Sequence, residues 1–182
     1  MNEPALAYVQ VNLNDTLDDV KIPKSFNCGD EFLNKYATSG SLKRAVKSEN
    51  LSATAILEGA NFVGFMTVGF ALLDKARVTF TKGNQPPQLP VAKVLMIAVD
   101  ERYQRLGIGT DLMLEAFTKA VAVHGTIPLK GVYLDAAPGK QEFYSNTFGF
   151  TALEGEGPAG TIPMYIPIED VIAALAEADD PK

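Results

Sequence analysis

Apolar residues recur along the chain in patterns that predict β-strands. Residues 51–58 and 61–72 are rich in strand-forming residues, and Gly59-Ala60 between them predicts a tight hairpin. Residues 91–100 are almost entirely apolar, which is typical of a central strand covered on both faces. The further predicted strands are residues 6–13, 130–136, 150–153 and 161–168.

Between these segments the apolar spacing changes to that of amphipathic helices. Residues 32–46 predict one or two short helices, and a short helix is predicted over residues 140–147. A longer helix follows the strand at 91–100 and ends at Gly125. Its expected buried face consists of Leu112, Met113, Ala116, Phe117, Ala120 and Val123.

This order of elements predicts an α/β fold with a mixed, mostly antiparallel sheet of six or seven strands and helices on both faces. The sequence contains no internal repeat, low-complexity tract or linker, so we expect a single domain over residues 1–182. We expect the acidic end, about residues 175–182, to be a frayed tail.

Composition narrows the classes of protein that fit. Of 182 residues, 47% are hydrophobic and 21% charged, which excludes a disordered, collagenous or coiled-coil chain. Cys28 is the only cysteine and His124 the only histidine, so an intramolecular disulfide and a cysteine-rich zinc site are excluded. A Ser-His-Asp or Cys-His catalytic site would need His124 as its base. The first residues do not resemble a signal peptide and no apolar run could span a membrane, so we expect a cytoplasmic protein that binds no metal.

Charge is distributed unevenly. The formal net charge is -6, yet residues 21–47 contain six basic and two acidic residues, as do residues 75–105. Both ends of the chain are acidic. Local positive potential can attract an anionic ligand to an acidic protein, although solvated faces without a function give the same pattern.

The turn between the apolar strand and the long helix is a candidate anion site. Backbone N–H groups of residues 105–110 would lie at a helix N-terminus without intrahelical partners, and Gly107 and Gly109 would let a phosphate approach the backbone. The Rossmann fingerprint is not met, since position 112 is Leu, and no Walker A lysine follows. A plain strand-to-helix turn remains the alternative when this motif is taken alone.

Two sequence motifs, in a fixed order along the chain, relate the glycine turn to a known protein family. Residues 104–109, QRLGIG, match Q/R-x-x-G-x-G/A, and residues 143–150, FYSNTFGF, follow at the expected distance. The sequence thus resembles the GNAT N-acetyltransferases. Residues 26–34, FNCGDEFLN, and the closing residues 164–168, MYIPI, are similar to the GNAT toxins of toxin-antitoxin modules, which acetylate aminoacyl-tRNA.

The resemblance implies a set of site residues. In GNAT enzymes the central strand separates from its neighbour and its backbone pairs with the pantetheine of acetyl-CoA, the diphosphate lies on the glycine turn, and a tyrosine protonates the departing thiolate. Tyr144 would be this catalytic acid. Acetyl-CoA would contact Ile97, Ala98, Val99, Gln104, Arg105, Leu106, Gly107, Ile108, Gly109, Thr110 and Phe143. The cations expected to contact tRNA are Lys35, Lys43, Arg44, Lys47, Lys93 and Arg102.

A general base is not evident in the sequence. An α-amine has a pKa near 7.7–8.0 and needs little help to lose a proton. Asp100 and Glu101 follow the central strand and could serve, but solvated loop acids are the more common case. We interpret His124 as a partner of the helix C-terminus and Cys28 as a packing residue.

Three functions remain open at this point. The first is a toxin that acetylates aminoacyl-tRNA, with a ribbon-helix-helix antitoxin as partner and a homodimer as its assembly. The second is a free-standing GNAT enzyme for a small amine or a peptide N-terminus, which the sequence pI of about 4.8 favours. The third is a CoA-binding module without catalysis, which an intact Tyr144 disfavours.

Overall fold

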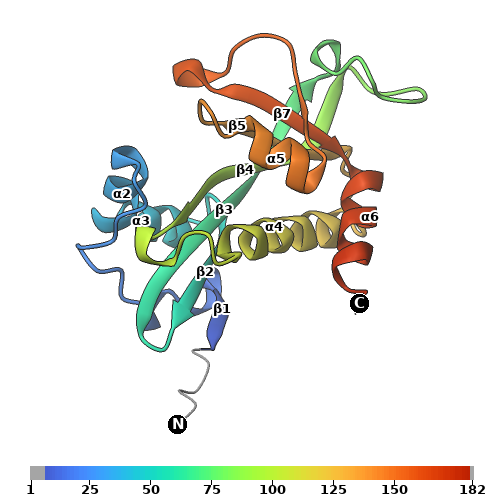
Figure 1. Ribbon diagram of the computed structural model, residues 1–182. Coiled ribbons are helices and arrows are strands. Elements are labelled where there is room, and N and C mark those ends of the chain that lie inside the picture. The colour runs from blue at the N-terminus through green and yellow to red at the C-terminus, as the bar shows by residue number, and fades with distance from the viewer. Residues whose placement is uncertain (1–6, 181–182) are drawn as a thin grey trace. The chain divides into compact units, whose positions relative to one another are not determined.

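The computed structural model describes residues 7–180, which fall into two compact units. The first unit comprises the chain up to Val68 together with Met96–Glu115, and the second comprises Gly69–Leu95 together with the chain from Ala116. Figure 1 traces the elements. Three of them, β3 (Asn61–Asp74), β4 (Gln88–Val99) and α4 (Ile108–His124), contribute one part to each unit.

The other elements belong to one unit each. The first unit contains β1 (Tyr8–Asn12), α1 (Leu13–Thr16), α2 (Glu31–Thr38), α3 (Ser41–Lys47) and β2 (Ser52–Glu58). The second contains β5 (Gly131–Ala136), α5 (Gln141–Phe148), β6 (Thr151–Ala152), β7 (Ile162–Pro167) and α6 (Ile168–Ala178). Short 3-10 turns occur at Leu17–Asp19, Lys75–Arg77, Glu101–Tyr103 and Pro158–Gly160.

The described strands form a seven-stranded sheet in the order β1-β2-β3-β4-β5-β7-β6. β1 pairs antiparallel with β2, β2 with β3, and β7 with both β5 and β6. The pair β4 and β5 is parallel, with Val91 opposite Gly131. The mixed, mostly antiparallel sheet that the sequence predicts is therefore confirmed.

In the first unit, α2 and α3 pack on one face of β2 and β3 (Figure 1). Ala53, Ala55 and Phe65 lie in a buried cluster with Leu42 and residues of the segment before α2. Successive strand residues point to opposite faces, and the intervening Thr54, Ile56 and Met66 are buried too. Both faces of these strands are therefore covered.

In the second unit, a buried cluster joins β3, β4, β5 and β7 through Leu73, Leu89, Val91, Tyr133 and Tyr165. At Gly131 the strands β5 and β7 leave no room for a side chain, because an added Cβ would collide with the carbonyl oxygen of Ile166 and with the Tyr165 ring. The phenol of Tyr165 donates to the Lys130 carbonyl oxygen at 2.6 Å. These contacts hold the two strands in register.

The predicted strands and helices are all present, with ends that differ by up to three residues, but neither α1 nor α6 is predicted from the sequence. The buried face of α4 contains the expected residues from Leu112 to Ala120, but Val123 is 47% exposed. The acidic end is not a frayed tail from residue 175, since α6 continues to Ala178 and only residues 181–182 lie outside the described part. Ile168 and Val171 are buried at helical spacing, which anchors this helix.

Candidate functional site

The backbone between β4 and α4 forms a turn that can hold an anion. Arg105 and Gly107 have φ of 64° and 85°, so the chain passes twice through the left-handed region. The first helical bond joins the Asp111 N–H to the Gly107 carbonyl oxygen at 3.0 Å. The N–H groups before Asp111 therefore have no partner within the helix. A Cβ added at Gly107 or Gly109 would meet no atom within 4 Å, so the space beside this turn is open.

Asp100, the first residue after β4, fixes this turn. Its side chain is 1% exposed, and its backbone N–H donates to the Val63 carbonyl oxygen at 2.8 Å. Its carboxylate accepts from Arg102 Nε at 2.8 Å and Nη2 at 3.1 Å, and from the Asn27 N–H at 3.3 Å. Burial acts to raise the pKa of this carboxyl, but these hydrogen bonds outweigh it and hold the pKa below its usual value.

Residues 26–34 are tied to the same turn. Gln104 donates through Nε2 to the Val99 carbonyl oxygen at 2.8 Å and to the Cys28 carbonyl oxygen at 3.0 Å. Asn27 donates through Nδ2 to Glu101 Oε2 at 2.9 Å, and Asn27 Oδ1 accepts from Asn34 Nδ2 at 2.8 Å. The FNCGDEFLN motif is thus the support of the anion turn.

Cys28 has the packing role expected from the sequence. The side chain is half-buried against the core of the first unit, and burial raises the pKa of its thiol. A thiol with a raised pKa forms little thiolate at neutral pH, which disfavours a nucleophile.

The three candidate bases all have structural partners. Asp100 is ionised and held by Arg102, and Glu101 accepts from Asn27. His124 Nδ1 accepts from the Leu129 N–H at 3.1 Å, beyond the end of α4. The two carboxylates after β4 therefore have structural partners, and neither is free to act as a general base.

Tyr144 lies on α5 in the second unit. Its ring makes edge contacts with Phe143, at 5.2 Å between centroids, and with Phe150, at 6.0 Å. Burial raises the pKa of its phenol, so the hydroxyl stays protonated at neutral pH. A protonated phenol can donate a proton to a leaving group.

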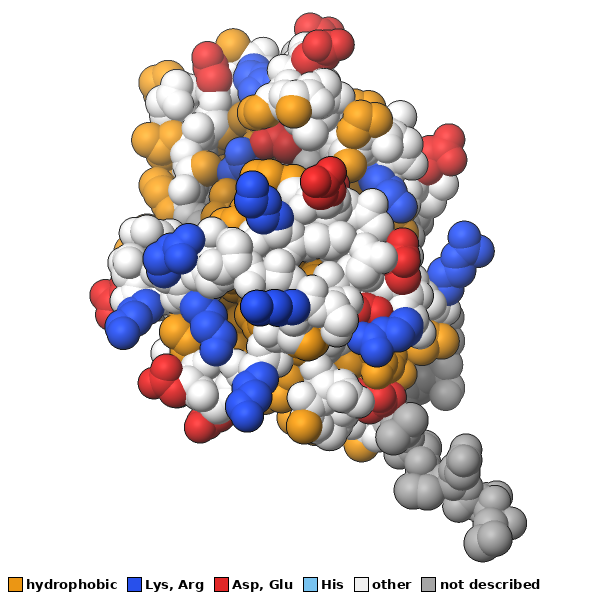
Figure 2. All heavy atoms as spheres, turned by 90° about the vertical axis from the view of Figure 1, so that its left-hand side faces the viewer, with side chains coloured by type: hydrophobic (Ala, Val, Ile, Leu, Met, Phe, Trp, Pro, Cys, Tyr) orange, Lys and Arg blue, Asp and Glu red, His pale blue; other side chains and the backbone are white. Residues whose placement is uncertain are grey.

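The cations predicted from the sequence fall into separate groups. Lys35 lies on α2 and Lys43, Arg44 and Lys47 lie on α3, within a stretch, residues 32–48, that contains no acidic residue. Figure 2, which views the molecule from the side of α2, shows basic side chains gathered across the middle of this face. Lys93 belongs to the second unit, where it pairs with Asp135 at 2.8 Å.

The structure therefore brings one part of the predicted site together in the first unit. That part comprises Ile97, Ala98 and Val99, the turn from Gln104 to Thr110, and the cations of α2 and α3 with Arg102. Phe143, Tyr144 and Lys93 belong to the second unit. The pairing of β4 with β5 covers Val91–Val94, and β4 continues to Val99.

Sequence reasoning missed the supporting residues Asn27 and Asn34. Their partners are 74 and 7 positions away in the chain, and side chains of this type are usually interpreted as loop residues. The spacing of the glycines gave the position of the turn, but nothing in the sequence indicated what holds it.

Comparison with known proteins identifies the family. Residues 29–166 match the model of the acetyltransferase (GNAT) family. The chain belongs to this family. No match was found among curated proteins. This GNAT chain contains, among the residues that the structure describes, no helix long and apolar enough to cross a membrane and no cluster of metal-ligating side chains.

Solved structures resemble this GNAT chain over nearly its whole length. A crystal structure of a bacterial toxin is 29% identical with a TM-score of 0.88, and the match covers 98% of this chain and 100% of that one. AtaT complexed with acetyl-methionyl-tRNAfMet is 20% identical with a TM-score of 0.78, over 92% and 98% of the two chains. A variant of AtaT bound to the C-terminus of the antitoxin AtaR and to acetyl-CoA is 19% identical with a TM-score of 0.72, over 91% and 96%.

The hydrogen bonds of Asp100 predict a measurable stability effect. Asp100→Asn keeps the size of the side chain but removes its charge, so the free energy of unfolding at pH 7 should fall by about 1–3 kcal/mol. The pKa of Asp100 is lower in the folded protein, so its contribution is complete above the unfolded pKa of about 3.9 and is lost as the pH falls below it. The difference between the two proteins should therefore shrink below about pH 4.

Urea titrations at pH 7 and pH 3 measure this difference. Asp18→Asn is the control, because Asp18 is an exposed carboxylate of the same unit. Equal stability of Asp100→Asn and the parent protein at pH 7 would show that Asp100 does not hold the turn.

Proposed function

We propose that this protein is a GNAT toxin that transfers the acetyl group of acetyl-CoA to the α-amine of an aminoacyl-tRNA and so blocks translation. The observation that carries the proposal is the presence, in one unit, of an open backbone anion turn and of the basic residues of α2 and α3, which lie in a stretch, residues 32–48, without an acidic residue. Likeness over the whole chain to a bacterial toxin supports the same conclusion.

The residues of the turn fit the diphosphate of acetyl-CoA. Backbone N–H groups at a helix N-terminus bind phosphate oxygens, and the glycines leave space for them. We assign this contact to Gln104, Arg105, Leu106, Gly107, Ile108, Gly109 and Thr110, and the pairing with pantetheine to the backbone of Ile97, Ala98 and Val99. When bound, acetyl-CoA supplies the acetyl group as a thioester.

Tyr144 supplies the proton for the thiolate that leaves. Its raised pKa keeps the phenol protonated, and Phe143 and Phe150 hold the ring through edge contacts. The acceptor needs no strong base, because an α-amine is substantially neutral near pH 8. This agrees with the absence of a free carboxylate at the end of β4, where Asp100 and Glu101 are both engaged.

The acceptor is recognised through its phosphates. Lys35, Lys43, Arg44 and Lys47 form a local positive surface on a chain whose net charge is -6. We assign Arg102 to the same surface and Lys93 to a lesser role, because Asp135 compensates its charge. A ribbon-helix-helix antitoxin, a homodimer and a cytoplasmic location complete the proposal, and the AtaT complex with AtaR supports an antitoxin partner.

If the anion turn binds the diphosphate, Gly109→Asp should weaken the binding of acetyl-CoA. An acidic side chain in the first turn of a helix favours the helix, so the fold should persist while the new charge repels the diphosphate. We expect the Kd for acetyl-CoA to rise at least about tenfold, measured by calorimetry. Gly109→Ala adds bulk without charge and should cause a smaller loss. Unchanged affinity in Gly109→Asp would exclude this turn as the diphosphate site.

Tyr144→Phe tests the proton donor. The ring contacts remain, so the Kd for acetyl-CoA should persist while kcat falls by about 10- to 1,000-fold, the range of general acid catalysis. Tyr8→Phe, an exposed tyrosine of the first unit, is the matched control and should retain full turnover. If Tyr144→Phe turns over at the parental rate, the phenol is a packing group.

The acceptor itself is tested with labelled acetyl-CoA and a pool of aminoacyl-tRNAs. We expect label on charged tRNA and none on deacylated tRNA, which lacks the amine. The KM for aminoacyl-tRNA should rise steeply with salt, and the double variant Arg44→Glu, Lys47→Glu should raise this KM further. Lys82→Glu, in the second unit, is the control and should leave it unchanged. Label on a free amine or peptide alone would replace the toxin proposal with a small-substrate acetyltransferase.

A further inference from the structure

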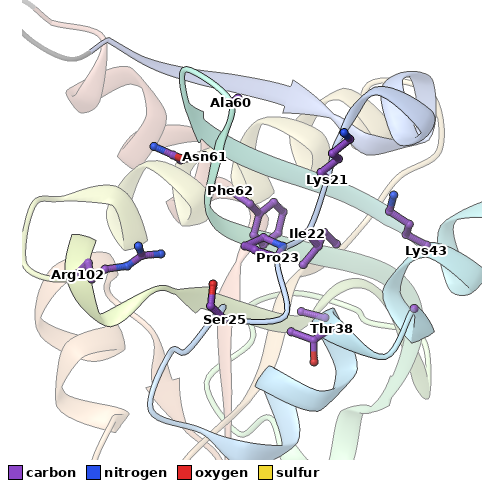
Figure 3. Close-up of a pocket in the computed structure, with 12 residues that line it drawn as sticks. Lys21, Ile22, Pro23, Ser25, Thr38, Lys43, Ala60, Asn61, Phe62 and Arg102 are labelled. Atoms are coloured by element: carbon purple, nitrogen blue, oxygen red, sulfur yellow. The ribbon is translucent and has the colours of Figure 1, made fainter.

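The first unit contains a pocket of positive character. It has a volume of about 590 Å³, and the anion turn does not contribute to its lining. Its walls come from the segment before α2, from α2 and α3, from the β2–β3 hairpin and from the turn after β4 (Figure 3). Lining residues that carry charge or a hydrogen-bonding group are Lys21, Ser25, Thr38, Lys43, Asn61 and Arg102.

The charge of this pocket is uncompensated at two positions. Three lining residues are cations, and no carboxylate is among the described residues that line the pocket. Arg102 is paired with Asp100, which offsets its charge. Lys43 Nζ donates only to the Val20 carbonyl oxygen, at 2.8 Å, and Lys21 has no side-chain partner among the described residues. A neutral carbonyl oxygen orients the Lys43 ammonium but leaves its charge available.

The rest of the lining is suited to more than a simple anion. Ile22, Pro23 and Phe62 provide apolar surface, and Figure 3 shows them between Arg102 on one side and Lys21 and Lys43 on the other. Asn61 can both donate and accept hydrogen bonds. A volume of about 590 Å³ lies within the range of small-ligand sites.

We propose that this pocket binds one nucleotide of the RNA acceptor, with its phosphate at Lys21 and Lys43. The inference rests on the proposed function and extends the basic surface of α3, to which Lys43 belongs. A nucleotide offers a phosphate that the cations can bind and a base whose apolar face can pack on Ile22 and Pro23. The edge of the base carries hydrogen-bonding groups that the amide of Asn61 can bind. A peptide rich in Asp and Glu would pair with the cations, but its carboxylate side chains offer no planar apolar face to Ile22 and Pro23, so the lining favours the nucleotide.

Lys21→Gln with Lys43→Gln tests the pocket in the full chain. The KM for charged tRNA should rise about 10- to 100-fold, as expected when charge-assisted hydrogen bonds are lost. The slope of log affinity against log salt should fall by about 1, because one phosphate contact is removed. The kcat and the Kd for acetyl-CoA should not change. Lys24→Gln is the control, since Lys24 is exposed in the same segment but does not line the pocket.

The single variant Lys21→Gln controls for a folding defect, because Lys43 donates to the Val20 carbonyl oxygen, whereas the Lys21 side chain has no bond with the part of the chain that the structure describes. The single variant should melt at the parental temperature and still raise KM. A parental KM and salt slope in the double variant would overturn the proposal. The proposal would also be overturned if the double variant lost binding to a glutamate-rich peptide but bound tRNA as tightly as the parent protein. The pocket would then serve an acidic protein partner.

Failure of the proposed function gives a different result. If the parent protein labels no charged tRNA, its binding to a short single-stranded RNA is measured by fluorescence anisotropy. Binding that Lys21→Gln weakens and Lys24→Gln does not would support the pocket while refuting the acceptor. Absence of RNA binding would overturn both.

Discussion

One buried carboxylate determines how the chain leaves the central strand. Asp100 is held by its backbone to Val63 on β3, and its side chain accepts hydrogen bonds from the next turn and from Asn27. A buried charge without such partners would be costly, so the geometry on all sides of Asp100 is tightly constrained. Gln104 in the following turn is fixed to Val99 and Cys28, and after it the chain passes through the left-handed region at Arg105 and Gly107, which only the glycine adopts without strain.

This arrangement gives residues 26–34 a structural role beside the glycine turn. The glycines make the turn open to a phosphate, but they also make the unfolded turn flexible. The asparagines of the motif offset this by binding Glu101 and one another. The anion turn can therefore be open and still ordered, which is what electrostatic binding by backbone dipoles requires.

Two kinds of positive site occur in the first unit. The turn presents backbone N–H groups, whereas the surface of α2 and α3 and the pocket beside it present side-chain cations. Backbone dipoles bind a phosphate at short range and do not depend on net charge, whereas side-chain cations act over a Debye length and depend on salt. A protein of net charge -6 can therefore present local positive potential to an anion.

Local periodicity was sufficient to predict most of the elements. The alternation in β2, the hairpin at Gly59-Ala60 and the helical spacing in α4 are all local signals, and the structure agrees with them. Two helices, α1 and α6, are not predicted by the local pattern. In α6 the buried residues Ile168 and Val171 lie at the N-terminal end of the helix, and their burial depends on the rest of the second unit.

The sequence by itself determined the strand order along the chain, the position of the glycine turn and the family, because each depends on residue types at fixed short spacings. Only the tertiary structure decided that Asp100 and Glu101 are bound by Arg102 and Asn27. It also decided that Lys21 and Arg102 line one pocket with Lys43. The contact of Glu101 with Asn27 and the shared pocket of Lys21 and Arg102 join segments more than 70 positions apart, and a single sequence contains no signal for contacts between such segments. The chemistry of a side chain depends on its neighbours in space, and folding alone creates those neighbours.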